Sequence, residues 1–257
     1  MTTLDGPKSL VQCILAPNPN HMTLQGTNSY VLGANSGRSV VVDPGPDMAE
    51  HLDAIVAAAG EVELVIFTHE HIDHTESIDS FVQLTGAPAR ALRAEYCRNG
   101  APVIDGEVIE AAGTTLRILA TPGHTSDSIS IVLPEFGEHG AVLTGDTILG
   151  GSTTVIVHPD GSIADYLESL DKIEALGDAR IFPGHGPEIA SAADEARKLR
   201  AHRKKRLAQV EQVVAEHPNG DATSVEDVLA IVYADAPQRV LGAARLSIEA
   251  QLQYLRG

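Results

Sequence analysis

A cluster of potential metal ligands lies in the stretch FTHEHIDHTE, residues 67–76. Within six positions it offers three imidazoles and one carboxylate, from His69, His71, Asp73 and His74. Imidazole and carboxylate ligands without thiolate suit zinc, and also manganese or iron, at a site open to water. An isolated histidine is usually a surface or core residue, but four ligands at fixed offsets after an apolar run favour a metal site. The cluster therefore predicts metal-assisted chemistry.

The apolar run Val62–Phe67 is expected to be the strand that carries this cluster at its end. Side chains alternate along a strand, so those of His69 and His71 would point to the same face. Asp73 and His74 would then lie on the tight turn beyond the strand. Such an arrangement can offer ligands to two neighbouring metal ions rather than one.

Three further candidate ligands each follow a predicted strand and each lie next to a glycine. His124 lies in the turn TPGHTSD, Asp146 in the stretch TGDT, and His185 in the turn PGHG. Turns at strand ends are positions where a rigid scaffold presents ligands. The predicted ligand set therefore has seven members, enough for two metal ions that share one carboxylate: His69, His71, Asp73, His74, His124, Asp146 and His185.

Other polar residues near predicted strand ends are candidates for supporting roles. Asp43 is followed by Pro-Gly-Pro, which cannot continue a sheet ladder, so Asp43 is expected at a strand end. It is either a turn former or a carboxylate that supports a metal ligand, and the number of ligands favours the second role. Thr27, Asn28, Ser152 and Thr153 either line the substrate pocket or only satisfy their own backbone.

The order of the expected elements indicates a layered α/β fold in which helices cover a sheet. Strands at 9–15 and 39–42 are followed by a helix that Asp47 caps, and residues 108–133 read as a meander of short strands. From Ser191 the pattern becomes helical throughout. We therefore expect a hydrolase domain at residues 1–190 and a small helical module at residues 191–257.

Composition fits an ordinary globular enzyme that stays in the cytoplasm. Of the 257 residues, 43% are hydrophobic and 21% are charged, and no apolar run approaches the roughly 20 residues of a membrane span. The first twenty residues lack the pattern of a secretory signal. Cys13 and Cys97 show no metal-binding or redox spacing, which favours a reducing, cytoplasmic compartment.

The charge is strongly acidic except in one segment. The net charge of −17 argues against a polyanion bound across a broad surface. Seven of the 18 basic residues nevertheless fall within residues 197–206, where no acid occurs. Helical spacing would place Arg200, Arg203 and Arg206 on one face. This basic run is either a solvated helix face or a patch that attracts phosphate or carboxylate groups.

Asp43, the H-x-H-x-D-H cluster, His124, Asp146 and His185 resemble, in order, the five motifs of the metallo-β-lactamase superfamily. The stretches MTLQGTNSY, TGDTILGGSTTV and FPGHGP resemble its lactamase-beta-like-2 branch. The resemblance covers nearly the whole chain and implies an αβ/βα four-layer sandwich (α/β, or α+β) with a dimetal site at one edge of its sheets. It also implies a winged-helix-like C-terminal module, here truncated because the last predicted helix leaves no room for the β-hairpin wing.

The resemblance also assigns ligand roles. His69, His71 and His124 would hold one zinc ion, and a second group of three residues would hold the other. That second group is Asp73, His74 and His185, with Asp146 bridging the two ions. True metallo-β-lactamases lack the bridging aspartate, which argues against antibiotic hydrolysis as the native activity.

Two zinc ions, with manganese or iron as alternatives, would supply hydroxide at neutral pH, because zinc lowers the pKa of bound water to about 7. Asp73 would also act in catalysis by aiming a hydroxide held between the ions. The leading hypothesis is a phosphodiesterase or endoribonuclease that acts on single-stranded RNA. The resemblance and the basic run favour this hypothesis, whereas the acidic remainder of the chain argues against it. The alternatives are a glyoxalase-II-like thioesterase on a small anionic ester or thioester and, remotely, a non-catalytic binding protein with structural metals.

Overall fold

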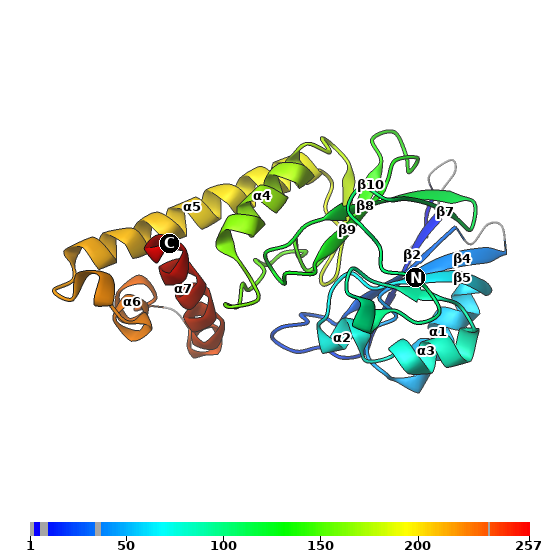
Figure 1. Ribbon diagram of the computed structural model, residues 1–257, viewed down its shortest axis with the longest axis horizontal. Coiled ribbons are helices and arrows are strands. Elements are labelled where there is room, and N and C mark those ends of the chain that lie inside the picture. The colour runs from blue at the N-terminus through cyan, green and yellow to red at the C-terminus, as the bar shows by residue number, and fades with distance from the viewer. Residues whose placement is uncertain (1–2, 6–9, 34–36, 236) are drawn as a thin grey trace.

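Two β-sheets face each other in the computed structural model, which describes residues 3–5, 10–33, 37–235 and 237–257 (Figure 1). The first sheet contains, in spatial order, β1 (Thr3–Asp5), β2 (Leu10–Leu15), β3 (Asn28–Leu32), β4 (Arg38–Val42), β5 (Glu61–Ile66) and β6 (Ala89–Arg90). The second contains β11 (Arg180–Pro183), β10 (Ala141–Gly145), β9 (Ile129–Leu133), β8 (Thr114–Ala120) and β7 (Val108–Ala111). The pairs β4–β5, β5–β6 and β10–β11 are parallel, and the other pairs are antiparallel.

Helices cover the outer face of each sheet. The helices are α1 (Ala49–Ala59), α2 (Ile72–Thr75), α3 (Ile78–Thr85), α4 (Ile163–Glu174), α5 (Ala192–Glu216), α6 (Val225–Val232) and α7 (Leu241–Arg256). Short 3₁₀ helices span Ala94–Tyr96, Gly220–Ala222 and Gln238–Val240. One core cluster joins the first sheet to α1 and α3, and another joins the second sheet to α4 and α5. This is the expected αβ/βα four-layer sandwich.

The valines of β4 show why the strand reads as a continuous apolar run. Val40 and Val42 pack in the core between the two sheets, whereas Val41 packs against the helices on the outer face. A strand that is buried on both faces has no polar side to expose, so its sequence does not alternate. The strand β4 therefore belongs to a sheet that is covered on both faces, and Asp43 follows directly at its carboxyl end.

The C-terminal helices form an extension beyond the second sheet (Figure 1). The first half of α5 packs on α4 in the core of the sandwich, and its second half packs with α6 and α7 in a cluster of their own. Ser224 and Asp227 form the capping box that starts α6. Because α5 belongs to both clusters, the division at residues 190 and 191 stays a prediction.

Local details differ from the expectation at two places. Asp47 does not cap α1, since the helix begins at Ala49 and the Asp47 carboxylate accepts a hydrogen bond from Ser80 instead. Asp73 and His74 lie on the short helix α2 rather than on a plain turn. Within the described residues, no helix has the length and apolar content needed to cross a membrane.

Candidate metal centre

The predicted ligands converge at one edge of the sandwich, where strands of both sheets end. His69 and His71 follow β5, while Asp73 and His74 lie on α2. The remaining ligands come from the second sheet: His124 from the β8–β9 turn, Asp146 from the end of β10, and His185 from the end of β11. The structure therefore brings together all seven residues that the sequence singled out.

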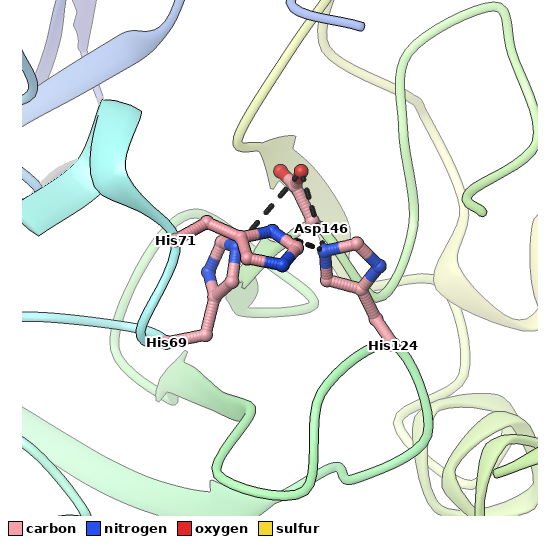
Figure 2. A group of neighbouring side chains, drawn as sticks. All are labelled: His69, His71, His124 and Asp146. Atoms are coloured by element: carbon pink, nitrogen blue, oxygen red, sulfur yellow. Dashed lines mark hydrogen bonds and ion pairs between the residues drawn. The ribbon is translucent and has the colours of Figure 1, made fainter. Parts of the chain in front are cut away.

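Four of these side chains form a first group, which Figure 2 shows: His69, His71, His124 and Asp146. Their potential ligand atoms all lie within 4.8 Å of one another. The Nδ1 atom of His71 lies 3.0 Å from Nε2 of His124. Asp146 Oδ2 lies 3.7 Å from Nε2 of His124 and 4.0 Å from Nε2 of His69. This spacing suits ligands that surround one small cation.

Asp73, His74 and His185 form the second group. Asp73 Oδ2 lies 3.4 Å from Nε2 of His74 and 3.2 Å from Nε2 of His185. Asp146 also contacts this group, since its Oδ1 lies 3.5 Å from His74 Nε2 and its Oδ2 lies 3.3 Å from His185 Nε2. Asp146 is thus the carboxylate that touches both groups, as a bridging ligand must.

The donor atoms fit a bound cation. His69 Nε2 and Asp146 Oδ1 are buried at the centre of the site, and neither has a hydrogen-bond partner among the described residues. A buried polar atom left without a partner costs about 1–3 kcal/mol. A divalent cation between the two groups would satisfy both atoms, and the combination of imidazoles with carboxylates matches zinc, iron or manganese.

The charges of the protein split the imidazoles of the site into two kinds. Burial lowers the pKa of His69 well below its ordinary value and that of His124 to about 4, so both are neutral ligands at pH 7. Burial also opposes protonation of His74 and His185, but neighbouring carboxylates outweigh it. The pKa of His74 rises well above its ordinary value, and that of His185 rises to about 9. The second group therefore favours positive charge.

Hydrogen bonds from the far side of each ring fix the orientation of the ligands. His124 Nδ1 donates to the Val155 carbonyl oxygen at 2.7 Å, and His185 Nδ1 donates to the Gly26 carbonyl oxygen at 3.0 Å. His74 Nδ1 lies 2.9 Å from Asp43 Oδ2. In each ring Nε2 is then the atom turned to the centre, which is the usual way in which proteins select the ligand nitrogen.

Asp43 lies at the strand end where the sequence placed it and contacts the candidate ligand His74. Its φ of 48° lies in the left-handed region, which aspartate tolerates better than most residues. Its carboxylate accepts hydrogen bonds from the backbone nitrogen and the hydroxyl of Thr68, both at 2.7 Å, and holds His74 from the same position. Asp43 therefore ties the end of β5 to α2.

The four predicted pocket residues have different positions. Thr27 donates a 2.9 Å hydrogen bond to Asp73 Oδ2, so it steadies a ligand. Asn28 does not line the cavity at the site but donates to the carbonyl oxygens of Pro183 and Gly186, on either side of His185. Ser152 and Thr153 do line the cavity.

Gly184 is required by the geometry of the centre. A Cβ atom at this position would lie 2.3 Å from Asp146 Oδ1 and 3.0 Å from the His74 ring. Real Cβ atoms do not come so close to other atoms, so the chain beyond β11 must carry glycine here for the carboxylate and imidazole ligands to meet.

A cavity of about 590 Å³ opens over the metal centre. Its floor contains five of the ligand residues, and one wall comes from the loop around Met22 and Leu24. The C-terminal helices also line it, through Tyr233, Ala243 and Ser247. No sequence pattern pointed to these helical residues as part of the site, because only the fold brings them there.

Within the basic run of α5, the face that carries Arg200, Arg203 and Arg206 is not exposed as expected. Arg203 is only 4% exposed, donates to the Thr154 carbonyl oxygen and lies over the Tyr166 ring. Arg200 pairs with Asp171 and Glu174, and Arg206 lies 4.7 Å from the centre of the Tyr233 ring. The expectation is wrong for Arg203 because this face of α5 packs on α4 and on the loop beside the metal centre.

Comparisons with known proteins agree with the fold and the site. The family model described as "Metallo-beta-lactamase superfamily" matches residues 22–185, more than half of the chain. The chain belongs to the metallo-β-lactamase superfamily, whose members are generally hydrolases.

Two relatives and one solved structure show the similarity. A β-lactamase-like protein 2 homologue of Caenorhabditis elegans is 35% identical over 254 residues, covering 94% of this chain and 82% of that protein. An atrochrysone carboxyl ACP thioesterase of Aspergillus fumigatus is 34% identical over 235 residues, covering 85% of this chain and 72% of that protein. A metallo-β-lactamase family protein of Thermus thermophilus has a TM-score of 0.77 at 24% identity, with 96% of this chain and 93% of that one covered.

Proposed function

We propose that this protein is a metal-dependent hydrolase that cleaves an ester or thioester carbonyl in a small molecule. The observation that carries the proposal is the lining of the cavity over the metal centre. Among the described side chains that line it, there is no lysine and no arginine. A polyanionic chain needs cations along its track, whereas a neutral acyl group needs apolar walls and a few polar atoms.

The seven ligands would hold two divalent ions, with Asp146 shared between them. Such ions would supply an activated water and polarise the carbonyl oxygen of the substrate. The chain itself fixes the ligand rings through Asp43, Val155 and Gly26, and it fixes Asp73 through the hydroxyl of Thr27. Asp73 is the more accessible carboxylate, with 23% of its side chain exposed against 10% for Asp146, so it can accept a hydrogen bond from the attacking water and aim it.

The lining of the cavity also limits which thioesters the protein could accept. A carboxylate-bearing thioester would need a basic residue near the site to hold its charge, and the described lining provides neither lysine nor arginine. We therefore propose a neutral acyl part, since the only basic side chain of the described lining outside the candidate ligands is the imidazole of His21. The relative from Aspergillus fumigatus, which is named an atrochrysone carboxyl ACP thioesterase, supports the choice of a thioester.

Cleavage of single-stranded RNA is the second candidate. It is supported by Lys204 and Lys205, which are exposed on α5. The burial of Arg203 and the ion pairs of Arg200 weaken it, because these cations are already used inside the protein.

The test uses the purified protein loaded with zinc, iron or manganese, with and without a chelator. One assay measures thiol release from a neutral acyl thioester, and the other measures cleavage of labelled single-stranded RNA. We expect thiol release that the chelator abolishes, with the RNA left intact. Chelator-sensitive RNA cleavage without thioester hydrolysis would overturn the proposal.

A further inference from the structure

The cavity is lined by two kinds of side chain. The candidate metal ligands His71, Asp73 and Asp146 belong to the first kind. Aliphatic side chains such as Leu149 and Val155 line the same cavity beside them. A carbonyl placed at the metals would therefore extend the rest of its acyl group into apolar surroundings. Burying an apolar group there is favourable in proportion to the area removed from water.

The wall on α7 is made of small side chains. Ala243, Ala244 and Ser247 line the cavity, and the three- and four-residue spacings to Ser247 place them on one helix face. Larger side chains at these positions would fill the space that now belongs to the cavity. Met22 and Leu24 line the same cavity from the loop between β2 and β3.

We propose that this face of α7, together with Met22 and Leu24, is the binding site for a neutral, bulky and apolar acyl group. The inference rests on the proposed function and adds the substrate class and the residues that select it. The volume of about 590 Å³ is in the range of pockets that hold whole small molecules, so an acetyl group alone would leave most of it unfilled. Small side chains on α7 set the upper size of the acyl group.

The side chain of Met22 suits an acyl group of variable shape. Met22 is 43% exposed, and its flexible thioether can adjust to acyl groups of different shapes. Tyr233, at the end of α6, adds an aromatic face to the same wall and is itself held by the Arg206 guanidinium. The loop therefore contributes an exposed, adaptable side chain to the site, and the end of α6 contributes an aromatic one.

The test changes one wall residue and one matched control. Ala243→Leu places a larger side chain in the wall at a half-buried position, whereas Gln253→Leu introduces the same residue at an exposed position of α7 away from the cavity. The substrates are acetyl, hexanoyl and naphthoyl thioesters of the uncharged thiol N-acetylcysteamine. The metal-loaded wild type should prefer the two larger acyl groups.

Ala243→Leu should lower kcat/KM for the naphthoyl thioester about tenfold or more, as expected for altered fit in an apolar pocket, and change the acetyl value little. Gln253→Leu should leave the order of preference unchanged. Calorimetric titration with the matching ketones, in which CH₂ replaces the thioester sulfur, gives a readout that does not need turnover. The naphthoyl ketone should bind wild type and Gln253→Leu alike and Ala243→Leu more weakly.

The outcomes separate the two proposals. If wild type hydrolyses the thioesters but Ala243→Leu affects all acyl groups equally or none, the acyl site is wrong and the hydrolase stands. If no thioester is hydrolysed but the naphthoyl ketone binds and Ala243→Leu weakens it, the reaction is wrong and the acyl site stands. Absence of ketone binding to wild type would overturn the acyl site by itself.

Discussion

The guanidinium group of Arg203 on α5 donates a hydrogen bond to the carbonyl oxygen of Thr154. The next residue, Val155, orients His124 through its own carbonyl oxygen. Thr154 also places its hydroxyl 3.0 Å from His124 Nδ1. Arg203 lies over the ring of Tyr166, which in turn packs closely against the glycine before His124. The helix α5 thus supports the candidate ligand His124 from two sides.

Arg203→Met is expected to weaken metal binding by the first ligand group about 10–100-fold, the usual effect of losing support behind a ligand. The methionine keeps much of the side-chain volume but cannot hold the Thr154 carbonyl. Lys204→Met, at an exposed neighbouring position, is the matched control and should bind metal like wild type. Titration against a competing chelator measures the affinity. A variant that loses thermal stability but keeps its metal affinity would reduce Arg203 to a packing role.

Asp146→Asn should separate metal content from folding. Wild type is expected to hold about two metal ions per chain, because seven ligands exceed what one tetrahedral site uses. Asparagine keeps the shape of the side chain but removes the anionic bridge, so the variant should hold about one ion or fewer and lose turnover. Metal analysis and circular dichroism give the two readouts. Full metal content with wild-type activity in the variant would refute the binuclear mechanism.

Metal binding by the second group should release protons. The carboxylates raise the pKa of His185 to about 9, so below that pH the ring holds a proton that a metal ion must displace from Nε2. Apparent affinity should therefore rise as pH increases toward 9, by roughly tenfold per pH unit for each proton displaced. Proton release on metal addition, followed with an indicator dye in weak buffer, checks this. The exposed variant His139→Gln should behave like wild type, and an affinity independent of pH between about 6 and 8 would contradict the prediction.

Gly184→Ala is expected to disrupt the centre although it adds a single methyl group. The added atom would lie 2.3 Å from Asp146 Oδ1, so the carboxylate or the strand end must move. Gly242→Ala, in α7, is the matched control, because nothing lies near an added Cβ there and neither glycine has a positive φ. We expect metal content to fall in Gly184→Ala and to stay unchanged in Gly242→Ala. Equal metal content in both variants would show that the centre tolerates a Cβ at residue 184.

The convergence of the seven candidate ligands could be predicted from the sequence because they lie in short motifs at strand ends. Asp43 could be predicted for the same reason, since the two prolines stop its strand. The role of Arg203 could not, because a run of cations reads as a solvated surface until α4 and the Thr154 loop are seen to cover it. The position of Ala243 in the cavity wall could not be predicted either, because a small residue in a helix gives no sequence pattern that indicates a binding site.

RNA binding by the basic run distinguishes between the two candidate substrates. In this run, Lys204 and Lys205 are exposed and have no ion-pair partner within the described part of the chain. In a plot of the logarithm of the binding constant against the logarithm of the salt concentration, each phosphate contacted on a single strand contributes about −0.7 to the slope. Two lysines can therefore account for a slope no steeper than about −1.4.

Single-stranded RNA binding is therefore measured over a range of salt concentrations for wild type, for the double variant Lys204→Ala/Lys205→Ala, and for Arg200→Ala. The double variant should lose whatever weak binding wild type shows at low salt. Arg200→Ala should leave the slope unchanged, because its guanidinium already pairs with Asp171 and Glu174. A wild-type slope of several units that survives removal of both lysines would reveal a phosphate track elsewhere on the protein, and RNA would then become the preferred substrate.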